Sequence, residues 1–135
     1  MTCIFCDILD GTRDGHIVYE DNDHIAILDK YPIDDGHTLV IPRKHHEKIT
    51  DMDSNDVGKI FSLIPKIAKA VLAGAGADAF SLAQNNGKAA KQIIPHVHIH
   101  IIPRYNNKGT VWTKRQISTD EVLSELAVKI KSAII

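Results

Sequence analysis

The sequence has few aromatic residues, only two cysteines, almost no net charge and no long apolar run. Its formal net charge is −1, so nothing indicates a large surface for nucleic acid or membranes. Because no run of roughly 18 apolar residues occurs, we expect no transmembrane helix. The first residues lack the basic start and apolar stretch of a signal peptide. We therefore expect a cytoplasmic protein that binds neither nucleic acid nor membrane.

The 135 residues contain no internal repeat, low-complexity tract or interdomain linker. A chain of this length can bury one hydrophobic core. We therefore expect a single domain over 1–135, with a core over about 3–105 and a C-terminal loop and helix over 106–135.

Apolar periodicity predicts strands over 17–20, 24–28, 38–41 and 79–84, and another within 94–103. A long helix is predicted to begin near Asp53 or Ser54 and to end at Gly74 and Gly76. A last helix should follow the capping box at 118–121. This order predicts an α+β domain with a five-stranded antiparallel sheet, one long central helix and a C-terminal helix.

The stretch 94–103 alternates between histidine and apolar residues. On a strand, His96, His98 and His100 share one face at intervals of about 6–7 Å. One zinc ion cannot take all three, because the outer pair lie about 13 Å apart and zinc–nitrogen bonds are about 2 Å long. Imidazole acts as base, acid or nucleophile near neutral pH. We therefore favour acid–base or nucleophilic work on a substrate over a strand that carries histidines by chance.

Cys3 and Cys6 form a Cys-x-x-Cys pair at the start of the sequence. A thioredoxin-like redox pair would follow a strand, and no strand is expected before Cys3. Two interpretations remain: ordinary buried cysteines, or two thiolate ligands of one tetrahedral zinc ion. The second needs two further ligands, which the eight histidines of the chain can supply.

The segment His96-Val97-His98-Ile99-His100-Ile101-Ile102 resembles the His-φ-His-φ-His-φ-φ signature of the histidine triad (HIT) family, in which φ is apolar. The runs 27–29 and 36–45 also resemble this family, so the likeness extends well beyond the triad. The resemblance implies the HIT fold, which agrees with the five predicted strands. It also implies a homodimer in which two sheets join into one.

The same resemblance implies a purine nucleotide substrate. His98 would attack the α-phosphorus of a purine nucleoside phosphoramidate or dinucleoside polyphosphate, and water would release the nucleoside monophosphate from the nucleotidyl-histidine. His100 would contact the phosphate and protonate the leaving group, while His96 and His37 would support the site. The implied substrate-binding residues are Asp29 at the ribose, Asn85 at the phosphate, Gln92 in the loop before the triad, and Ile4, Phe5, Ile8 and Ile27 around the base.

Two positions depart from the family pattern. Lys91 stands where glycine is usual, and Ile93 stands where serine, threonine or glutamate is common. A missing hydroxyl removes one phosphate contact, worth roughly 1–3 kcal/mol, whereas Lys91 adds a charge that suits a longer polyphosphate. These departures leave open an alternative function, a zinc-stabilised nucleotide-binding module with negligible turnover.

The resemblance also bears on zinc. In relatives with Cys-x-x-Cys, the zinc is completed by a histidine after the third strand and by the first triad histidine. The matching ligands here are Cys3, Cys6, His45 and His96, with His46 as a substitute for His45. Such a zinc is structural, because all four ligands come from protein.

Overall fold

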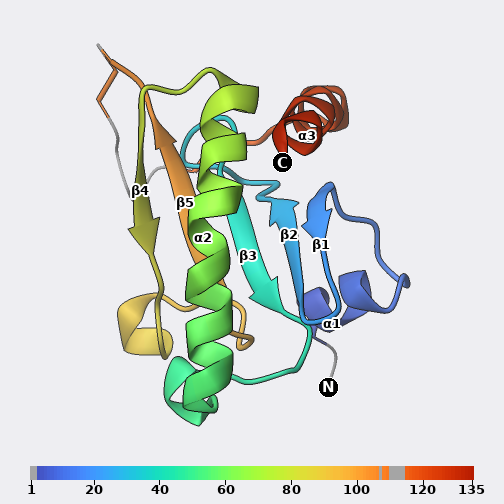
Figure 1. Ribbon diagram of the computed structural model, residues 1–135, viewed down its shortest axis with the longest axis vertical. Coiled ribbons are helices and arrows are strands. Elements are labelled where there is room, and N and C mark those ends of the chain that lie inside the picture. Colours follow the sequence, from blue (N-terminus) through green and yellow to red (C-terminus); the bar gives the residue numbers. More distant parts are fainter. Residues whose placement is uncertain (1–2, 107, 110–114) are drawn as a thin grey trace.

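The computed structural model describes residues 3–106, 108–109 and 115–135. A five-stranded sheet has the order β1-β2-β3-β5-β4, and every neighbouring pair is antiparallel. With its helices (Figure 1), this sheet confirms the predicted α+β fold class. The polar loop after Arg104, which carries Trp112, lies partly outside the described residues. The elements are β1 (Ile17–Glu20), β2 (His24–Leu28), β3 (Thr38–Pro42), β4 (Ala79–Ala83), β5 (Ile99–Arg104), α1 (Ile4–Leu9), α2 (Ser54–Ala75), α3 (Asp120–Ala133) and the 3-10 turns η1 (Ile49–Asp51) and η2 (Lys88–Ala90).

The sheet buries a different apolar cluster on each face. On one face, residues such as Val40 and Ile99 pack with Ile67 of α2 and Ile130 of α3, and α2 lies over the sheet in Figure 1. On the other face, Phe5 of α1 packs with residues of β2 and β3. We call this second side the α1 face. None of the described helices is both long enough and apolar enough to span a membrane.

Helix α2 begins where the sequence predicted but does not end at both predicted glycines. Asp53 caps it by accepting a hydrogen bond from the Asn55 N–H at 2.7 Å, and Gly76 ends it with φ +68°. Gly74 instead lies inside the helix. A Cβ there would lie only 2.6 Å from Cγ1 and 2.7 Å from Cα of Ile130. Gly74 therefore allows α3 to approach α2 closely.

Helix α1 was not predicted from the sequence. Its N-cap is Cys3, whose Sγ accepts a hydrogen bond from the Cys6 N–H at 3.5 Å. Cysteine is not a residue that signals a helix start, and six residues are too few for a clear apolar period. The helix lays Phe5 on the α1 face and presents both cysteines to the loops beyond β3 and before β5.

The prediction that all three triad histidines lie on one strand is wrong. Strand β5 begins at Ile99, so only His100 lies in the ladder, opposite Leu39. The partner strand β3 ends at Pro42, which has no N–H to donate. Before Ile99 the chain is held by the β3–η1 loop instead, and the Val97 N–H donates to the His46 carbonyl at 2.8 Å.

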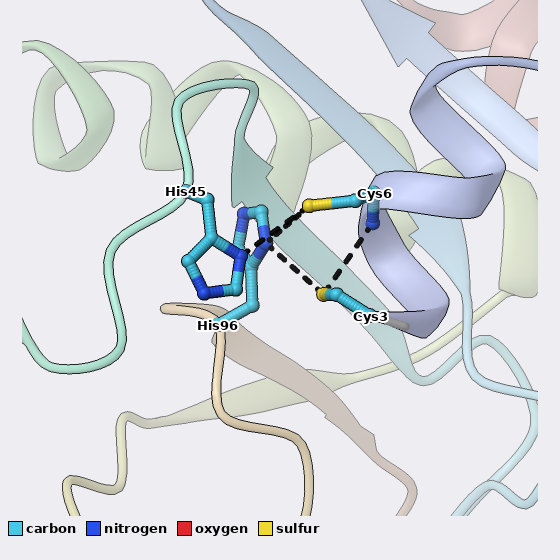
Figure 2. Close-up of side chains that lie close together, drawn as sticks. All are labelled: Cys3, Cys6, His45 and His96. Carbon is cyan, nitrogen blue, oxygen red and sulfur yellow. Dashed lines mark hydrogen bonds between the residues drawn. The ribbon is translucent and has the colours of Figure 1, made fainter. Parts of the chain in front are cut away.

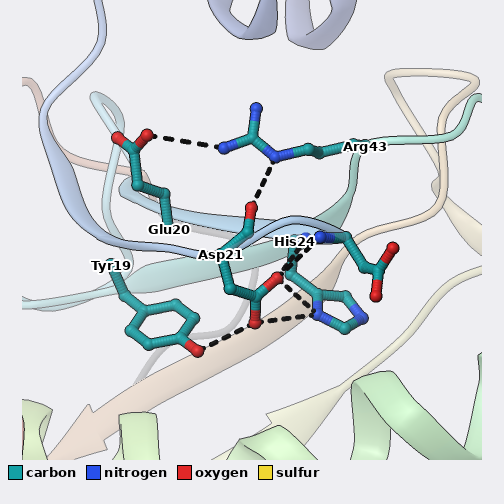
Figure 3. Close-up of polar contacts among 6 residues, drawn as sticks. Tyr19, Glu20, Asp21, His24 and Arg43 are labelled. Atoms are coloured by element: carbon teal, nitrogen blue, oxygen red, sulfur yellow. Dashed lines mark hydrogen bonds and ion pairs between the residues drawn. The ribbon is translucent and has the colours of Figure 1, made fainter.

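A polar cluster fixes the β1–β2 turn (Figure 3). Asp21 accepts hydrogen bonds from the Tyr19 hydroxyl at 2.8 Å and from the His24 backbone N–H at 2.7 Å. The Nε–H of Arg43 donates to the Asp21 carbonyl at 2.7 Å. Although burial opposes the shift, hydrogen bonds from Tyr19, Asp23 and His24 to the carboxylate lower the pKa of Asp21 to about 2. The cluster therefore holds the basic segment after β3 against the turn.

Candidate functional site

A cavity of about 440 Å³ lies on the α1 face, beside the start of β5. Its apolar wall suits a flat, hydrophobic group. The polar residues in its wall are Asp29, Tyr31, Lys91, His98, His100, Arg115 and Gln116. The apolar residues in its wall are Ile4, Phe5, Leu39, Ile93, Ile94 and Ile117.

His98 is fixed in one tautomer. Its Nδ1 lies 2.7 Å from the backbone carbonyl of His96, and a carbonyl can only accept, so Nδ1 carries the proton. The lone pair is then on Nε2. Burial lowers the pKa of His98, against the hydrogen bond to His96 and the charge of Asp29. The ring is therefore a neutral imidazole with an available lone pair at the edge of the cavity.

Behind the cavity, a hydrogen-bond chain fixes His37 and His100. The Ile33 N–H donates to Nδ1 of His37 at 3.0 Å. The proton of His37 therefore lies on Nε2, which donates to Nδ1 of His100 at 2.9 Å. His100 in turn carries its proton on Nε2. Burial lowers the pKa of His37 to about 2 and that of His100 to about 3, so both rings are neutral at pH 7.

Asp29 is the carboxylate of the cavity, and its side chain is 14% exposed. Its Oδ1 accepts from the Tyr31 N–H at 2.9 Å, and its Oδ2 accepts from Nη1 of Arg115 at 2.9 Å. Burial raises the pKa of Asp29, and the donors from Tyr31 and Arg115 oppose that rise. One oxygen therefore organises the loop, and the other faces a cation.

Arg115 was not singled out from the sequence, because a lone arginine in a polar loop has no recognisable pattern. Its segment is held by backbone hydrogen bonds from the Gln116 N–H to the Pro32 carbonyl at 2.9 Å and from the Ser118 N–H to the Lys30 carbonyl at 3.3 Å. These bonds lay the segment along the loop after β2. Arg115 is thereby placed at the cavity wall.

A second cavity of about 510 Å³ adjoins the first. The two share Lys91, Ile93, His100 and Arg115 in their walls. Asn85, predicted to contact the phosphate, lines only the second. His100 therefore stands between an apolar cavity that contains His98 and a cavity that contains Asn85.

Besides His37, which lies behind the first cavity, four residues predicted to be catalytic or substrate-binding line neither cavity. The side chain of Gln92 accepts from the Gly87 N–H at 2.7 Å and donates to the Glu47 carbonyl at 2.6 Å, so it holds two loops together. Ile8 and Ile27 pack in the apolar cluster around Phe5. His96 is fully buried and faces the cysteines.

Cys3, Cys6, His45 and His96 converge into a candidate metal centre (Figure 2). Nδ1 of His96 lies 3.5 Å from Sγ of Cys3 and 3.6 Å from Sγ of Cys6, and Nδ1 of His45 lies 3.3 Å from Sγ of Cys6. Zinc bonds of about 2.3 Å to sulfur and about 2.1 Å to nitrogen place neighbouring tetrahedral ligands roughly 3.6 Å apart. The spacing and the donor types therefore fit zinc. His46 is not in this group.

The protonation of two of these ligands bears on metal binding. Nε2 of His96 lies 2.8 Å from the Pro42 carbonyl, so the proton is on Nε2 and the Nδ1 lone pair points to the cysteines. Burial, the hydrogen bond with Cys3 and nearby negative charge raise the pKa of Cys6 to about 11. A bound cation would favour the thiolate and release this proton.

Comparison with known proteins gives a consistent match. A family model described as "HIT domain" matches residues 10–107. An uncharacterised HIT-like protein of Methanocaldococcus jannaschii is 39% identical over 92% of this chain and 98% of its own length. An adenosine 5′-monophosphoramidase of Schizosaccharomyces pombe is 36% identical over 97% and 100%. An adenylylsulfatase of Arabidopsis thaliana is 37% identical over 85% of this chain and 58% of its own length.

Solved structures agree with these relatives. A hypothetical histidine triad nucleotide-binding protein from Sulfolobus tokodaii superposes with a TM-score of 0.91 at 34% identity, over 98% of this chain and 91% of its own. A zinc-bound histidine triad family protein from Mycobacterium smegmatis superposes with a TM-score of 0.90 at 34% identity, over 99% and 94%.

Proposed function

The chain belongs to the HIT domain family, and from this premise we propose that it is a hydrolase acting at the α-phosphate of purine nucleoside phosphoramidates or dinucleoside polyphosphates. The observation that carries the proposal is the fixed tautomer of His98, whose Nε2 lone pair lies beside a nucleotide-sized cavity. Relatives named as an adenosine 5′-monophosphoramidase and an adenylylsulfatase support this class of substrate.

In the first step, Nε2 of His98 attacks the α-phosphorus. A nitrogen–phosphorus bond forms, and the bond from phosphorus to the leaving group breaks, with both electrons going to the leaving group. The positive charge that the ring gains is stabilised by the His96 carbonyl, which accepts from Nδ1–H. The Nε2–H of His100, oriented through His37, donates a hydrogen bond to the departing atom, and an amine leaving group gains its proton from solvent, so that His100 stays neutral.

In the second step, water attacks the phosphorus of the nucleotidyl-histidine. The nitrogen–phosphorus bond breaks, the electron pair returns to Nε2 of His98, the nucleoside monophosphate departs with the water oxygen, and the proton released by the water passes to solvent. Asp29 holds the ribose through charge-assisted hydrogen bonds. The base lies against the apolar wall, which includes Ile4 and Phe5.

We propose that Cys3, Cys6, His45 and His96 hold a structural zinc. The zinc would take no part in the reaction. It would join the α1 segment to His96, whose carbonyl orients His98. The zinc-bound relative from Mycobacterium smegmatis supports this assignment.

We also propose a homodimer formed along β4. This strand is at the edge of the sheet, and it exposes Phe80 and Leu82 at 39% and 46%. Edge strands with exposed apolar side chains are sites of strand pairing. Light scattering of the wild type and of Leu82→Glu tests this: the wild type should have twice the mass of the variant.

The test of the proposed activity is incubation with adenosine 5′-phosphoramidate. The enzyme should release adenosine monophosphate, and His98→Asn should not. A wild-type protein that binds adenosine monophosphate but releases none from the substrate would instead be the zinc-stabilised binding module.

A further inference from the structure

We propose that the second cavity is a leaving-group subsite that recognises a phosphate or sulfate oxyanion, with Lys91 as the recognising cation. This inference rests on the proposed function, because it assigns the leaving group of the same reaction. The shared chemistry of the ligand is a tetrahedral oxyanion attached to the α-phosphate.

The position of the cavity follows from in-line displacement at phosphorus. Nε2 of His98 attacks from the first cavity, so the leaving group must depart on the opposite side. His100 lines both cavities, whereas His98 lines only the first. A nucleoside bound against the apolar wall, with its α-phosphate at His100, therefore directs its leaving group into the second cavity.

The charge of the second cavity selects the leaving group. Its polar side chains are Asn85, Lys91, His100 and Arg115, and no carboxylate lines it among the described residues. Arg115 is already paired with Asp29 through Nη1. Lys91, by contrast, is in none of the ion pairs found within the described part of the chain. Lys91 is therefore a cation without a countercharge.

The backbone conformation of Lys91 also supports this role. Its φ is +66°, and among the described residues it is the one non-glycine residue with positive φ. Glycine adopts this conformation without steric cost, whereas a side chain does not. The structure therefore places a charged side chain at a cavity wall on a backbone conformation that favours glycine, which supports a role for this side chain at the wall.

The reaction balances with an anionic leaving group. When the phosphorus–oxygen bond to sulfate breaks, sulfate departs with the electron pair and needs no proton, and the nucleotidyl group remains on His98. An amine leaving group must instead gain a proton. Because His100 is neutral, its Nε2–H can donate a hydrogen bond to either group, whereas the charge of Lys91 stabilises only the anion.

The binding test compares adenosine monophosphate with adenosine diphosphate, whose second phosphate would enter the subsite. Lys91→Gly removes the charge and suits the backbone, Lys91→Gln keeps the side-chain length, and Lys91→Arg keeps the charge. We expect the glycine and glutamine variants to weaken diphosphate binding roughly tenfold or more, and monophosphate binding less than about threefold. Lys91→Arg should retain the preference. Lys88→Gln, in the adjacent η2 and lining neither cavity, is the matched control.

The kinetic test separates sulfate from phosphate and from amine. The neutral variants should lower kcat/KM for adenosine 5′-phosphosulfate and for diadenosine triphosphate, but change that for adenosine 5′-phosphoramidate less than about threefold. A loss with only one of the anionic substrates identifies its leaving group as the one the subsite recognises. Equal losses of monophosphate and diphosphate binding, or no loss of either, would overturn the subsite. If no substrate is hydrolysed at all, the proposed function fails, and the binding comparison still decides the subsite.

Discussion

The backbone carbonyl of His96 accepts a hydrogen bond from Nδ1 of His98 at 2.7 Å, while the ring of His96 lies 3.5 Å and 3.6 Å from the two cysteine sulfurs. One residue therefore faces the candidate metal centre with its side chain and the candidate nucleophile with its main chain. Disorder of the α1 segment that displaces His96 would also displace the carbonyl that fixes the tautomer of His98.

Removal of zinc should lower stability strongly and activity only in part. A zinc ion at this site would tie the α1 segment to the loop before β5, and its binding free energy would add to that of folding. We expect chelation, or Cys3→Ser with Cys6→Ser, to lower the melting temperature by about 10 °C or more. His45→Asn should do the same, whereas His46→Asn should retain zinc. Metal analysis that finds less than about a tenth of an equivalent of zinc, with unchanged melting in the double mutant, would rule out the site.

Asp29→Ala should weaken binding of adenosine monophosphate more than binding of its 2′-deoxy analogue. A carboxylate accepts strong, charge-assisted hydrogen bonds from ribose hydroxyls, so we expect roughly a tenfold loss for the ribonucleotide. Asp35→Ala, an exposed carboxylate in the same loop, serves as the control in isothermal titration calorimetry. Equal losses for both sugars would mean that Asp29 only organises the Tyr31 turn and pairs with Arg115.

Stability should fall as the pH drops below about 6.5. Unfolded His37 binds a proton near its ordinary pKa of 6.5, whereas in the fold burial lowers the pKa to about 2. Between these values the unfolded chain binds more protons, so stability rises with pH, by up to about 1.4 kcal/mol per pH unit for one such group. In urea denaturation, His37→Asn should therefore lose less free energy of unfolding, relative to the wild type, at pH 5 than at pH 8. The same loss at both pH values would contradict the neutral, buried state of His37.

Gly74→Ala should destabilise the fold by about 1–3 kcal/mol, because the added Cβ would overlap the Ile130 backbone and push α3 away from α2. Gly58→Ala is a matched control in the same helix, where a Cβ meets nothing within 4 Å. That variant should stabilise the protein by about 0.5–1 kcal/mol through helix propensity. Equal effects in thermal melts would show that α3 does not depend on close approach at Gly74.

Local patterns predicted most elements of the fold. The alternation of strands, the cap at Asp53 and the αL glycine at Gly76 are determined within a few residues, and each appears as expected. Helix α1 was missed because its cap is a thiol. The prediction that one strand carries all three triad histidines was wrong. The start of β5 depends on where its partner β3 ends, which the periodicity of 94–103 cannot show.

The candidate site was predictable where a residue belongs to a motif, as with His98 and His100. Asp29 could be placed because it closes a strand within a family run. Arg115 carries no such signal, and Leu39, although it lies in the family run 36–45, has no feature there that marks it as a cavity residue. The place of both at the cavity results from tertiary packing. Gln92 lies in the family motif, yet its amide connects two loops, a role that depends on a carbonyl 45 residues away.

The most direct test of the central claim is detection of the nucleotidyl-His98 intermediate. The protein is mixed with adenosine 5′-phosphoramidate and quenched in alkaline denaturant, because acid would cleave a nitrogen–phosphorus bond, and its peptides are then examined by mass spectrometry. We expect an adenylyl group on the peptide that contains His98, and neither adduct nor adenosine monophosphate release from His98→Asn, which should still fold and bind nucleotide. An adduct on another residue, or near wild-type release by His98→Asn, would contradict the assignment of His98 as the nucleophile.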